Sequence, residues 1–142
     1  MPASHYLSSS QILDMLSQTP IQGKRQLEPL KAQAAQMGFP MNILEDHEVD
    51  NAAELHKHED DLWFCFEGEA TFVCGGELMD GKAKVRKDGT IDDNEWKGRI
   101  EGGTEYVLKP GDWLWIPAGE PHQHACKGTA RLAIIKIPTK KA

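Results

Sequence analysis

From Met41 onward the chain is a succession of short apolar runs, cut by Gly, Pro and Asp, with no amphipathic helical pattern between them. These runs are rich in aromatic and β-branched residues, which favour strands. The run LAIIKI, residues 132–137, carries apolar side chains at both sets of alternating positions. A strand of this kind is buried on both faces, as in a sandwich or closed barrel in which one sheet packs on another. The pattern therefore predicts an all-β domain.

The first forty residues have a different pattern, which predicts two short helices. The segment SSSQILDMLSQTP offers Ser10 as an N-cap, apolar residues on one stripe and Pro20 as a stop. The segment GKRQLEPLKAQAAQMGFP predicts a second helix that ends at Gly38, with Pro29 tolerated only in its first turn. This part is too short to bury a core of its own. We therefore expect residues 1–40 to form a helical N-terminal extension and residues 41–142 to form the β-barrel domain.

Two further features concern the strands. The polar segment 75–106 is full of Asp-Gly and Gly-Gly pairs, which predicts an extended hairpin anchored by Trp96 and Ile100. The aromatic residues of the apolar runs are expected to lie chiefly in the core, and they are Trp63, Phe64, Phe66, Phe72, Trp113 and Trp115.

Composition excludes several partners and settings. The formal net charge of −6 argues against nucleic acid, which is bound by clustered Lys and Arg. Three cysteines without C-x-x-C spacing argue against a disulfide framework and favour a reducing compartment. The N-terminus lacks the pattern of a signal peptide, and no apolar run approaches the roughly 20 residues that span a bilayer. We expect a cytoplasmic protein that does not bind membranes.

Two histidine pairs with one intervening residue are the strongest chemical signal. His56 and His58 form the first pair, and His122 and His124 form the second. In an extended strand, residues i and i+2 point to the same face about 6.5 Å apart, so each pair can present two imidazoles to one side. A single pair is more often solvated than ligating, but two such pairs in one small β domain favour a metal site.

The residues around both pairs resemble the motifs of small single-domain cupins. In the second motif, Gly111 is followed after five residues by Pro117-Ala118-Gly119 and then, after two residues, by His122. The first motif is represented by His56, His58 and Gly68, with departures. Asp50 stands where the family has its first glycine, the segment between His58 and Gly68 is about two residues short, and the glutamate position falls on Asp61. Cys126 stands where the second motif ends with asparagine.

The resemblance covers about residues 41–138 and implies a cupin double-stranded β-helix, or jelly-roll barrel. Carried over, the family's metal ligands are His56, His58, Asp61 and His122. Such a set suits a divalent first-row metal, with iron first and manganese, nickel or zinc as alternatives. Glu59 and Asp60 are rival carboxylate donors, because simple alternation from His58 points Asp61 away. Three histidines completed by water are a further alternative.

His124 shares a face with His122, and it is the candidate catalytic residue for proton transfer. The alternatives are a fourth imidazole ligand, a hydrogen-bond partner of a ligand, or a barrel-lining histidine bound to a backbone carbonyl. Cys126 continues the same parity, but a buried cysteine is more often packing than chemistry.

The predicted function is a metal-dependent oxygenase of the dioxygenase type that acts on a small, oxygen-rich, chelating substrate. The alternatives are a metal-dependent isomerase and a non-catalytic cupin that binds a small ligand or a metal. The few candidate cations for the pocket, Lys57, Arg99 and Arg131, favour a weakly charged diketone, phenol or keto acid. The Trp-rich strands favour a homodimer, because an uncovered strand edge is a liability in a monomer.

Overall fold

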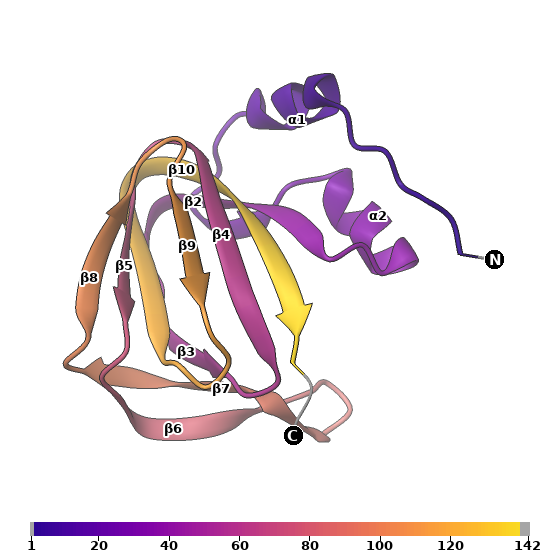
Figure 1. Cartoon of the computed structure of the whole chain (residues 1–142). Helices are drawn as coiled ribbons and strands as arrows, with labels where there is room; N and C mark the ends of the chain where they lie inside the picture. The colour runs from indigo at the N-terminus through magenta and orange to yellow at the C-terminus, as the bar shows by residue number, and fades with distance from the viewer. Residues whose placement is uncertain (1, 140–142) are drawn as a thin grey trace.

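The computed structural model describes residues 2–139, and antiparallel strands make up most of this part of the chain (Figure 1). Two helices precede most of the strands, α1 (Ser9–Leu16) and α2 (Leu30–Met37). The strands, in chain order, are β1 (Gly23–Gln26), β2 (Met41–Asp50), β3 (Ala53–His56), β4 (Glu59–Glu67), β5 (Ala70–Cys74), β6 (Glu77–Val85), β7 (Ile91–Glu101), β8 (Thr104–Leu108), β9 (Trp113–Ile116) and β10 (His122–Pro138). The predicted all-β barrel is confirmed.

The long strand β10 organises the barrel. Along one edge it pairs with β2, and along the other it pairs first with β5 and then with β4. The register with β2 shifts between Cys126 and Thr129, where the strand changes direction. Strand β9 adds to β4 and β8 adds to β5, which completes the curved wall seen in Figure 1. The first residue of β10, His122, also pairs with Glu54 of β3, so β10 reaches the end of the barrel where β3 lies.

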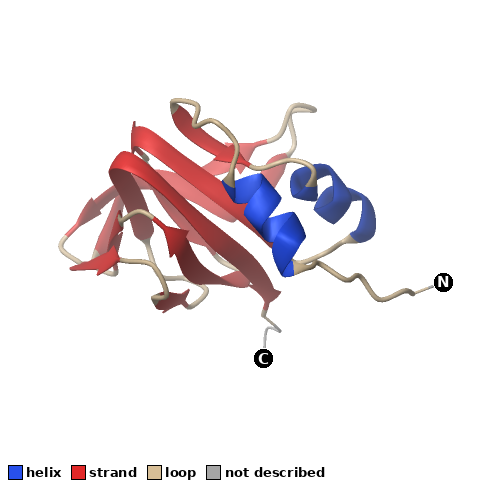
Figure 2. Ribbon diagram, turned by 90° about the horizontal axis from the view of Figure 1, so that it is seen from above, coloured by secondary structure: helices blue, strands red, loops and turns tan. Residues whose placement is uncertain are grey.

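The two helices lie together against one side of the barrel (Figure 2). Helix α1 begins after Ser8, whose side chain accepts a hydrogen bond from the Gln11 N–H while the Gln11 side chain accepts one from Ser8 N. The predicted cap at Ser10 is therefore wrong by two residues, because this reciprocal pair fixes the start. Helix α2 ends, as predicted, at Gly38, which has a left-handed φ of 72°. Neither helix of residues 2–139 reaches the length and apolarity needed to cross a bilayer.

The extension is not purely helical. Strand β1 runs antiparallel to β2, with Gly23 opposite His47 and Gln26 opposite Leu44. Residues 23–26 carry no apolar run, so no local pattern predicts a strand there, and the pairing with β2 creates the strand. The boundary at residue 40 remains a prediction.

Strand β2 is buried on both faces by two different partners. Leu44 faces the barrel interior, within the cluster that contains Trp63, Phe72 and Leu132. Its neighbour Ile43 faces outward and packs with residues of the helical extension. The apolar character of both faces is therefore explained by a barrel interior on one side and helices on the other, and not by two stacked sheets alone.

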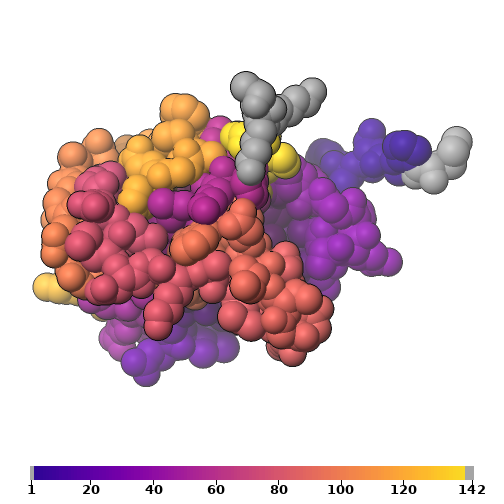
Figure 3. All heavy atoms as spheres, turned by 90° about the horizontal axis from the view of Figure 1, so that it is seen from below, coloured from indigo at the N-terminus to yellow at the C-terminus, as the bar shows by residue number. Residues whose placement is uncertain are grey.

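The polar segment forms the predicted hairpin, made of β6 and β7. In the view from below, its atoms spread across that end of the molecule (Figure 3). Strand β7 also pairs with β3, which ties the hairpin to the strand that carries His56. Trp96 and Ile100 are both partly buried at this junction.

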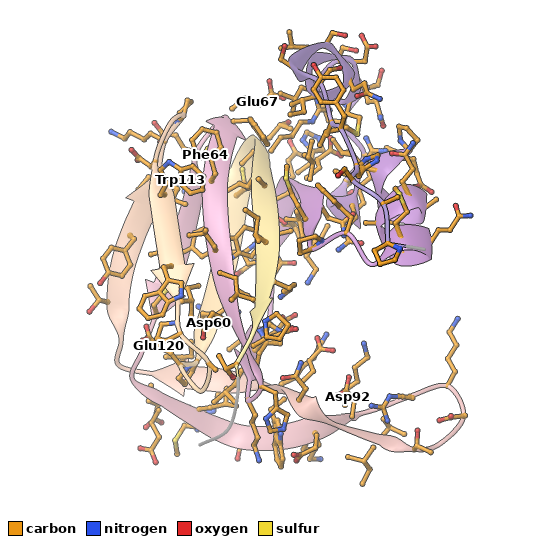
Figure 4. All side chains as sticks on the ribbon, turned by 45° about the vertical axis from the view of Figure 1, so that its right-hand side comes forward. Asp60, Phe64, Glu67, Asp92, Trp113 and Glu120 are labelled. Atoms are coloured by element: carbon orange, nitrogen blue, oxygen red, sulfur yellow. The ribbon has the colours of Figure 1, made fainter. Side chains whose placement is uncertain are left out.

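The prediction of a buried position is wrong for Trp113 and Trp115, which are 60% and 57% exposed. Their inward neighbours on β9 are Leu114 and Ile116, so alternation places both indoles on the outer surface. Figure 4 shows Trp113 beside Phe64 of β4, and their ring centroids are 4.6 Å apart. Trp63 and Phe72 do lie in the core. The homodimer remains a prediction.

Gly68 is the motif position at which substitution should cost most. It turns the chain between β4 and β5 with a φ of +74°, and a Cβ there would lie 1.9 Å from the backbone oxygen of Thr129. Gly68→Ala should therefore lower the free energy of unfolding by about 2 kcal/mol or more. Gly89→Ala is the matched control, because its φ is also positive (+86°) but nothing lies within 4 Å. Urea unfolding of both variants measures the difference in the free energy of unfolding. An equal loss of stability in the two variants would contradict the steric explanation.

Candidate metal centre

His56 and His58 do not act as a pair. Strand β3 ends at His56, residues 57 and 58 form a bend, and β4 begins at Glu59. The alternation that predicted a shared face is broken at this bend. His56 is buried, whereas the His58 side chain is 33% exposed and its Nε2 lies 3.4 Å from the Asp93 carboxylate on β7. Asn94 fixes the bend, because its side-chain oxygen accepts a hydrogen bond from His58 N. His58 therefore lies apart from the other candidate ligands.

The structure does bring His56, Asp61 and His122 together from three strands. Alternation restarts at the beginning of β4, so Asp61 points inward with Trp63 and Cys65. The pattern on β10 is the predicted one, with His122, His124 and Cys126 all buried on one face. Asp61 Oδ2 lies 3.5 Å from His56 Nδ1 and 3.3 Å from His122 Nε2.

These contacts are not aligned as hydrogen bonds, and His56 Nδ1 and Asp61 Oδ2 are buried without a hydrogen-bond partner. Buried polar atoms without partners are rare and costly, which makes the pair informative. Ligand atoms bound at about 2.1 Å to one ion lie roughly 3.0–3.5 Å apart, which is the separation seen here. His122 also directs Nδ1 to the backbone oxygen of Glu120 at 3.1 Å, and this second bond leaves Nε2 free as a donor to a metal.

The carboxylates around this cluster have distinct positions. Glu54 and Glu59 flank it, because Glu54 groups with His56 and His122, and Glu59 groups with His56 and Asp61. Asp60 points elsewhere, since its Oδ1 accepts a hydrogen bond from Ala118 N at 2.7 Å and thereby holds the turn before β10. In Figure 4, Asp60 lies near Glu120, at the same end of the barrel. Among the three carboxylates considered from the sequence, Asp61 and Glu59 are placed to bind an ion with His56.

Glu54 was missed as a donor by sequence reasoning, although a signal was present. It lies two residues before His56 on β3, so the alternation used for the histidine pairs also places it on the same side. Its Oε2 is 3.5 Å from His56 Nε2. His56 thus presents one nitrogen toward Glu54 and the other toward Asp61.

Lysines compensate the charge of these carboxylates. Lys136 Nζ donates to Asp61 Oδ1 at 2.7 Å, and Lys24 Nζ donates to Glu54 Oε1 at 3.3 Å. Burial raises the pKa of Asp61, but contacts with His122 and His56 and the charge of Lys136 outweigh it, so this pKa lies well below its ordinary value. The pKa of Glu54 is likewise lowered, against the effect of burial, by Lys24 and the two histidines. Both carboxylates are therefore ionised near neutrality.

His124 lies next to the cluster in a fixed orientation. Its Nδ1 donates to Asp46 Oδ2, and Asn51 Nδ2 donates to the other Asp46 oxygen at 3.1 Å. The ring packs against Trp63 and Phe72, with centroids 5.2 Å from each. Because Nδ1 is committed to a buried carboxylate, Nε2 is the nitrogen left to exchange a proton. Sequence reasoning missed Asp46 and Asn51, which have no motif of their own.

A cavity of ≈ 470 Å³ is lined by His56, Asp61, His122 and His124, with Trp63 as part of its wall. The cations expected from the sequence are absent from its lining. Lys57 stacks over Trp96, Arg99 lies on the exposed hairpin, and Arg131 is buried beside Glu45. Four other basic residues line the cavity instead, and they are Lys24, Arg25, Lys31 and Lys136. The scarcity of cations that favoured a weakly charged substrate is therefore not found.

Cys126 lies on the predicted face but does not join the cluster. Its Sγ donates to the backbone oxygen of Glu69 at 3.2 Å, and burial raises the pKa of the thiol. It lines a separate pocket, together with Gly68 and Thr71. These surroundings favour packing over metal binding.

The donor set fits a divalent transition metal. Imidazole nitrogens and carboxylate oxygens lie close together, and His56 Nδ1 and Asp61 Oδ2 are among the buried atoms that lack partners. His122 has the backbone-bound ring typical of a ligand. Two groupings around His56 could hold such an ion, Glu54 with His56 and His122, or His56 with Glu59 and Asp61. The metal's identity is not determined by this set.

No protein-family model and no curated protein sequence matched the chain. Solved structures do match. The ribosomal oxygenase YcfD from Escherichia coli superposes with a TM-score of 0.52 at 18% identity, over 72% of this chain and 23% of that one. A sugar phosphate isomerase of the cupin superfamily from Silicibacter pomeroyi superposes with a TM-score of 0.50 at 16% identity, over 82% of this chain and 60% of that one. The chain thus spans less than two thirds of either protein. At these identities the likeness concerns the fold, and the fold of this chain is the double-stranded β-helix of the cupins.

Proposed function

We propose that this protein is a metal-dependent oxygenase that acts on a small, oxygen-rich molecule able to chelate the metal. The observation that carries the proposal is that two imidazoles, His56 and His122, and one carboxylate, Glu54, present ligand atoms within 4.8 Å of one another on a cavity wall. Two histidines with one carboxylate are the donor set of non-haem iron(II) oxygenases, so iron is the first choice, with manganese, nickel or zinc as alternatives. Bound iron would supply the activation of dioxygen and the polarisation of the substrate.

The residues of the chain itself would orient the substrate and move a proton. His124 borders the same cavity, and its bond to Asp46 leaves Nε2 available to accept a proton from a hydroxyl or a carbon acid. Trp63 and Phe72 hold the ring by packing, so the position of Nε2 does not depend on the ligand. Asp46 would stabilise the imidazolium after proton transfer, because its carboxylate is completely buried against the ring.

The pairing of His124 with Asp46 also favours a second function, a metal-dependent isomerase. Such an enzyme needs a fixed base beside a metal-polarised carbonyl, and needs no dioxygen. The two functions differ in a measurable way. An oxygenase consumes dioxygen. An isomerase consumes no dioxygen, but it exchanges a carbon-bound proton of the substrate with solvent.

Oxygen uptake by the iron-loaded protein with a panel of catechols and diketones tests the proposal. His124→Gln should retain metal at the wild-type stoichiometry and lower kcat by roughly 100-fold to 1000-fold, because the metal site remains while the base is lost. His47→Gln is the control, since His47 contacts Thr129 and does not line the cavity. Deuterium exchange without oxygen uptake would favour the isomerase. Metal retention with neither reaction would leave a non-catalytic binding protein.

A further inference from the structure

The charges around the His56 cluster balance without a bound ion. Its three carboxylates, Glu54, Glu59 and Asp61, have ammonium groups within 4 Å: Lys24 at 3.3 Å and Lys97 at 3.9 Å from Glu54, and Lys136 at 2.7 Å from Asp61 and 3.8 Å from Glu59. Three negative charges therefore meet three positive charges. With the histidines neutral, a bound dication would leave this cluster with a surplus of two positive charges, of which the buried carboxylate of Asp46 behind His124 offsets one.

The hairpin wall of the cavity does not offset this surplus. Its acidic residues already have cationic partners on the hairpin itself, since Glu95 lies 3.0 Å from Lys84 and Asp92 lies 3.6 Å from Arg86. In Figure 4, Asp92 lies on the arm that extends away from the barrel. A positively charged site in a partly enclosed cavity attracts anions, and leaving its charge uncompensated is unfavourable.

The N-terminal extension adds a further cation to the cavity lining. Lys24 and Lys31 line the cavity from β1 and the start of α2. Within residues 2–139, Lys31 has no carboxylate within 4.0 Å of its ammonium group, whereas Arg25 is held by Glu45 and by the backbone oxygen of Thr19. Lys31 is thus the cavity-lining cation that is left without an acidic partner. It belongs to the N-terminal extension, outside the barrel that holds the metal-binding cluster.

We propose that the ligand of this cavity carries an anionic group, such as a carboxylate, in addition to the oxygens that it offers to the metal. Lys31, which lines the cavity together with Lys24, binds this group. The N-terminal extension therefore determines which chelating molecules are accepted, and the barrel supplies the metal. This inference rests on the metal-dependent function proposed above and narrows its substrate class.

Two probes that differ only in the anionic group test the proposal. Catechol and 3,4-dihydroxybenzoate chelate through the same pair of oxygens, but only the second carries a carboxylate. We expect 3,4-dihydroxybenzoate to bind the manganese(II)-loaded protein about fivefold to tenfold more tightly than catechol at low salt, with the preference shrinking as salt is added. Isothermal titration calorimetry measures both affinities.

Lys31→Gln should remove most of this preference and leave catechol affinity within about twofold, while Lys31→Arg should restore it. Lys109→Gln, which changes an exposed lysine away from the cavity, is the matched control. Manganese retention by each variant shows that the protein is folded and loaded. Equal affinity for the two probes in the wild type, or an unchanged preference in Lys31→Gln, would overturn the anionic-ligand proposal alone. Failure of the wild type to retain any of manganese, iron, nickel or zinc would instead overturn the metal-dependent function.

Discussion

His56→Ala should lower the affinity for a divalent metal about 100-fold or more, whereas His58→Ala should leave it nearly unchanged. His56 is buried and lies within 3.5 Å of both Glu54 and Asp61, so removal of its ring takes a donor from each possible grouping of ligands. The His58 ring is a third exposed and faces Asp93 on the hairpin. The two substitutions are chemically identical and two residues apart, which makes them a matched pair.

Metal analysis of protein purified without added metal or chelator gives the stoichiometry, and competition with a chromogenic chelator gives the affinity. Asp61→Asn separates the two groupings around His56. A large loss of metal affinity in this variant would assign the ion to the grouping with Asp61. A small loss of affinity would assign it to the grouping with Glu54. Equal losses of metal affinity from His56→Ala and His58→Ala would contradict the arrangement described above and would favour the ligand set that the resemblance implies, which includes His58.

Arg131→Ala should lower the free energy of unfolding by about 3–5 kcal/mol. The substitution would leave the buried carboxylate of Glu45 with only one of its two arginine partners. Arg131 is 3% exposed and Glu45 is completely buried, and the guanidinium donates to Glu45 Oε1 through both Nε and one terminal nitrogen. The same guanidinium donates to the backbone oxygens of Leu16, the last residue of α1, and of Gln18, two residues further on. The contacts of Arg131 therefore join the barrel to the helical extension. Removal of the guanidinium should loosen the extension as well.

Denaturant unfolding measures the loss, and Arg99→Ala is the control, since Arg99 forms ion pairs only on the exposed hairpin and its removal should change stability little. The cluster also predicts a pH dependence. Burial raises the pKa of Glu45, but hydrogen bonds from Arg25 and Arg131 outweigh it, so this pKa lies below its ordinary value in the folded protein. A lowered folded-state pKa contributes stability above the unfolded value, and this contribution is lost as the pH falls through the folded value. Arg131→Ala should therefore flatten the acid limb of the stability profile, and an unchanged acid limb would contradict this account.

The barrel was predictable because its signals are local. Strands with apolar residues at both alternating positions, turns at Gly and Pro, and the hairpin of residues 77–101 all follow from patterns within a few residues. The pair on β10 was predictable for the same reason, since His122 and His124 lie in one uninterrupted strand. Alternation fails where a strand ends, and the bend at residues 57 and 58 therefore reversed the expectation for His58 and restored Asp61.

By itself, the sequence determined that this chain forms an all-β barrel with two histidine-bearing segments and a cupin-like second motif. Only the tertiary structure decided which donors meet. Lys136 faces Asp61 through the register of β10 with β4, and Asp46 meets His124 across 78 positions of the chain. Likewise, the exposure of Trp113 and Trp115 depends on which face of β9 has a covering layer. These outcomes depend on strand register and on what covers each face, which are properties of contacts between distant segments and leave no local pattern.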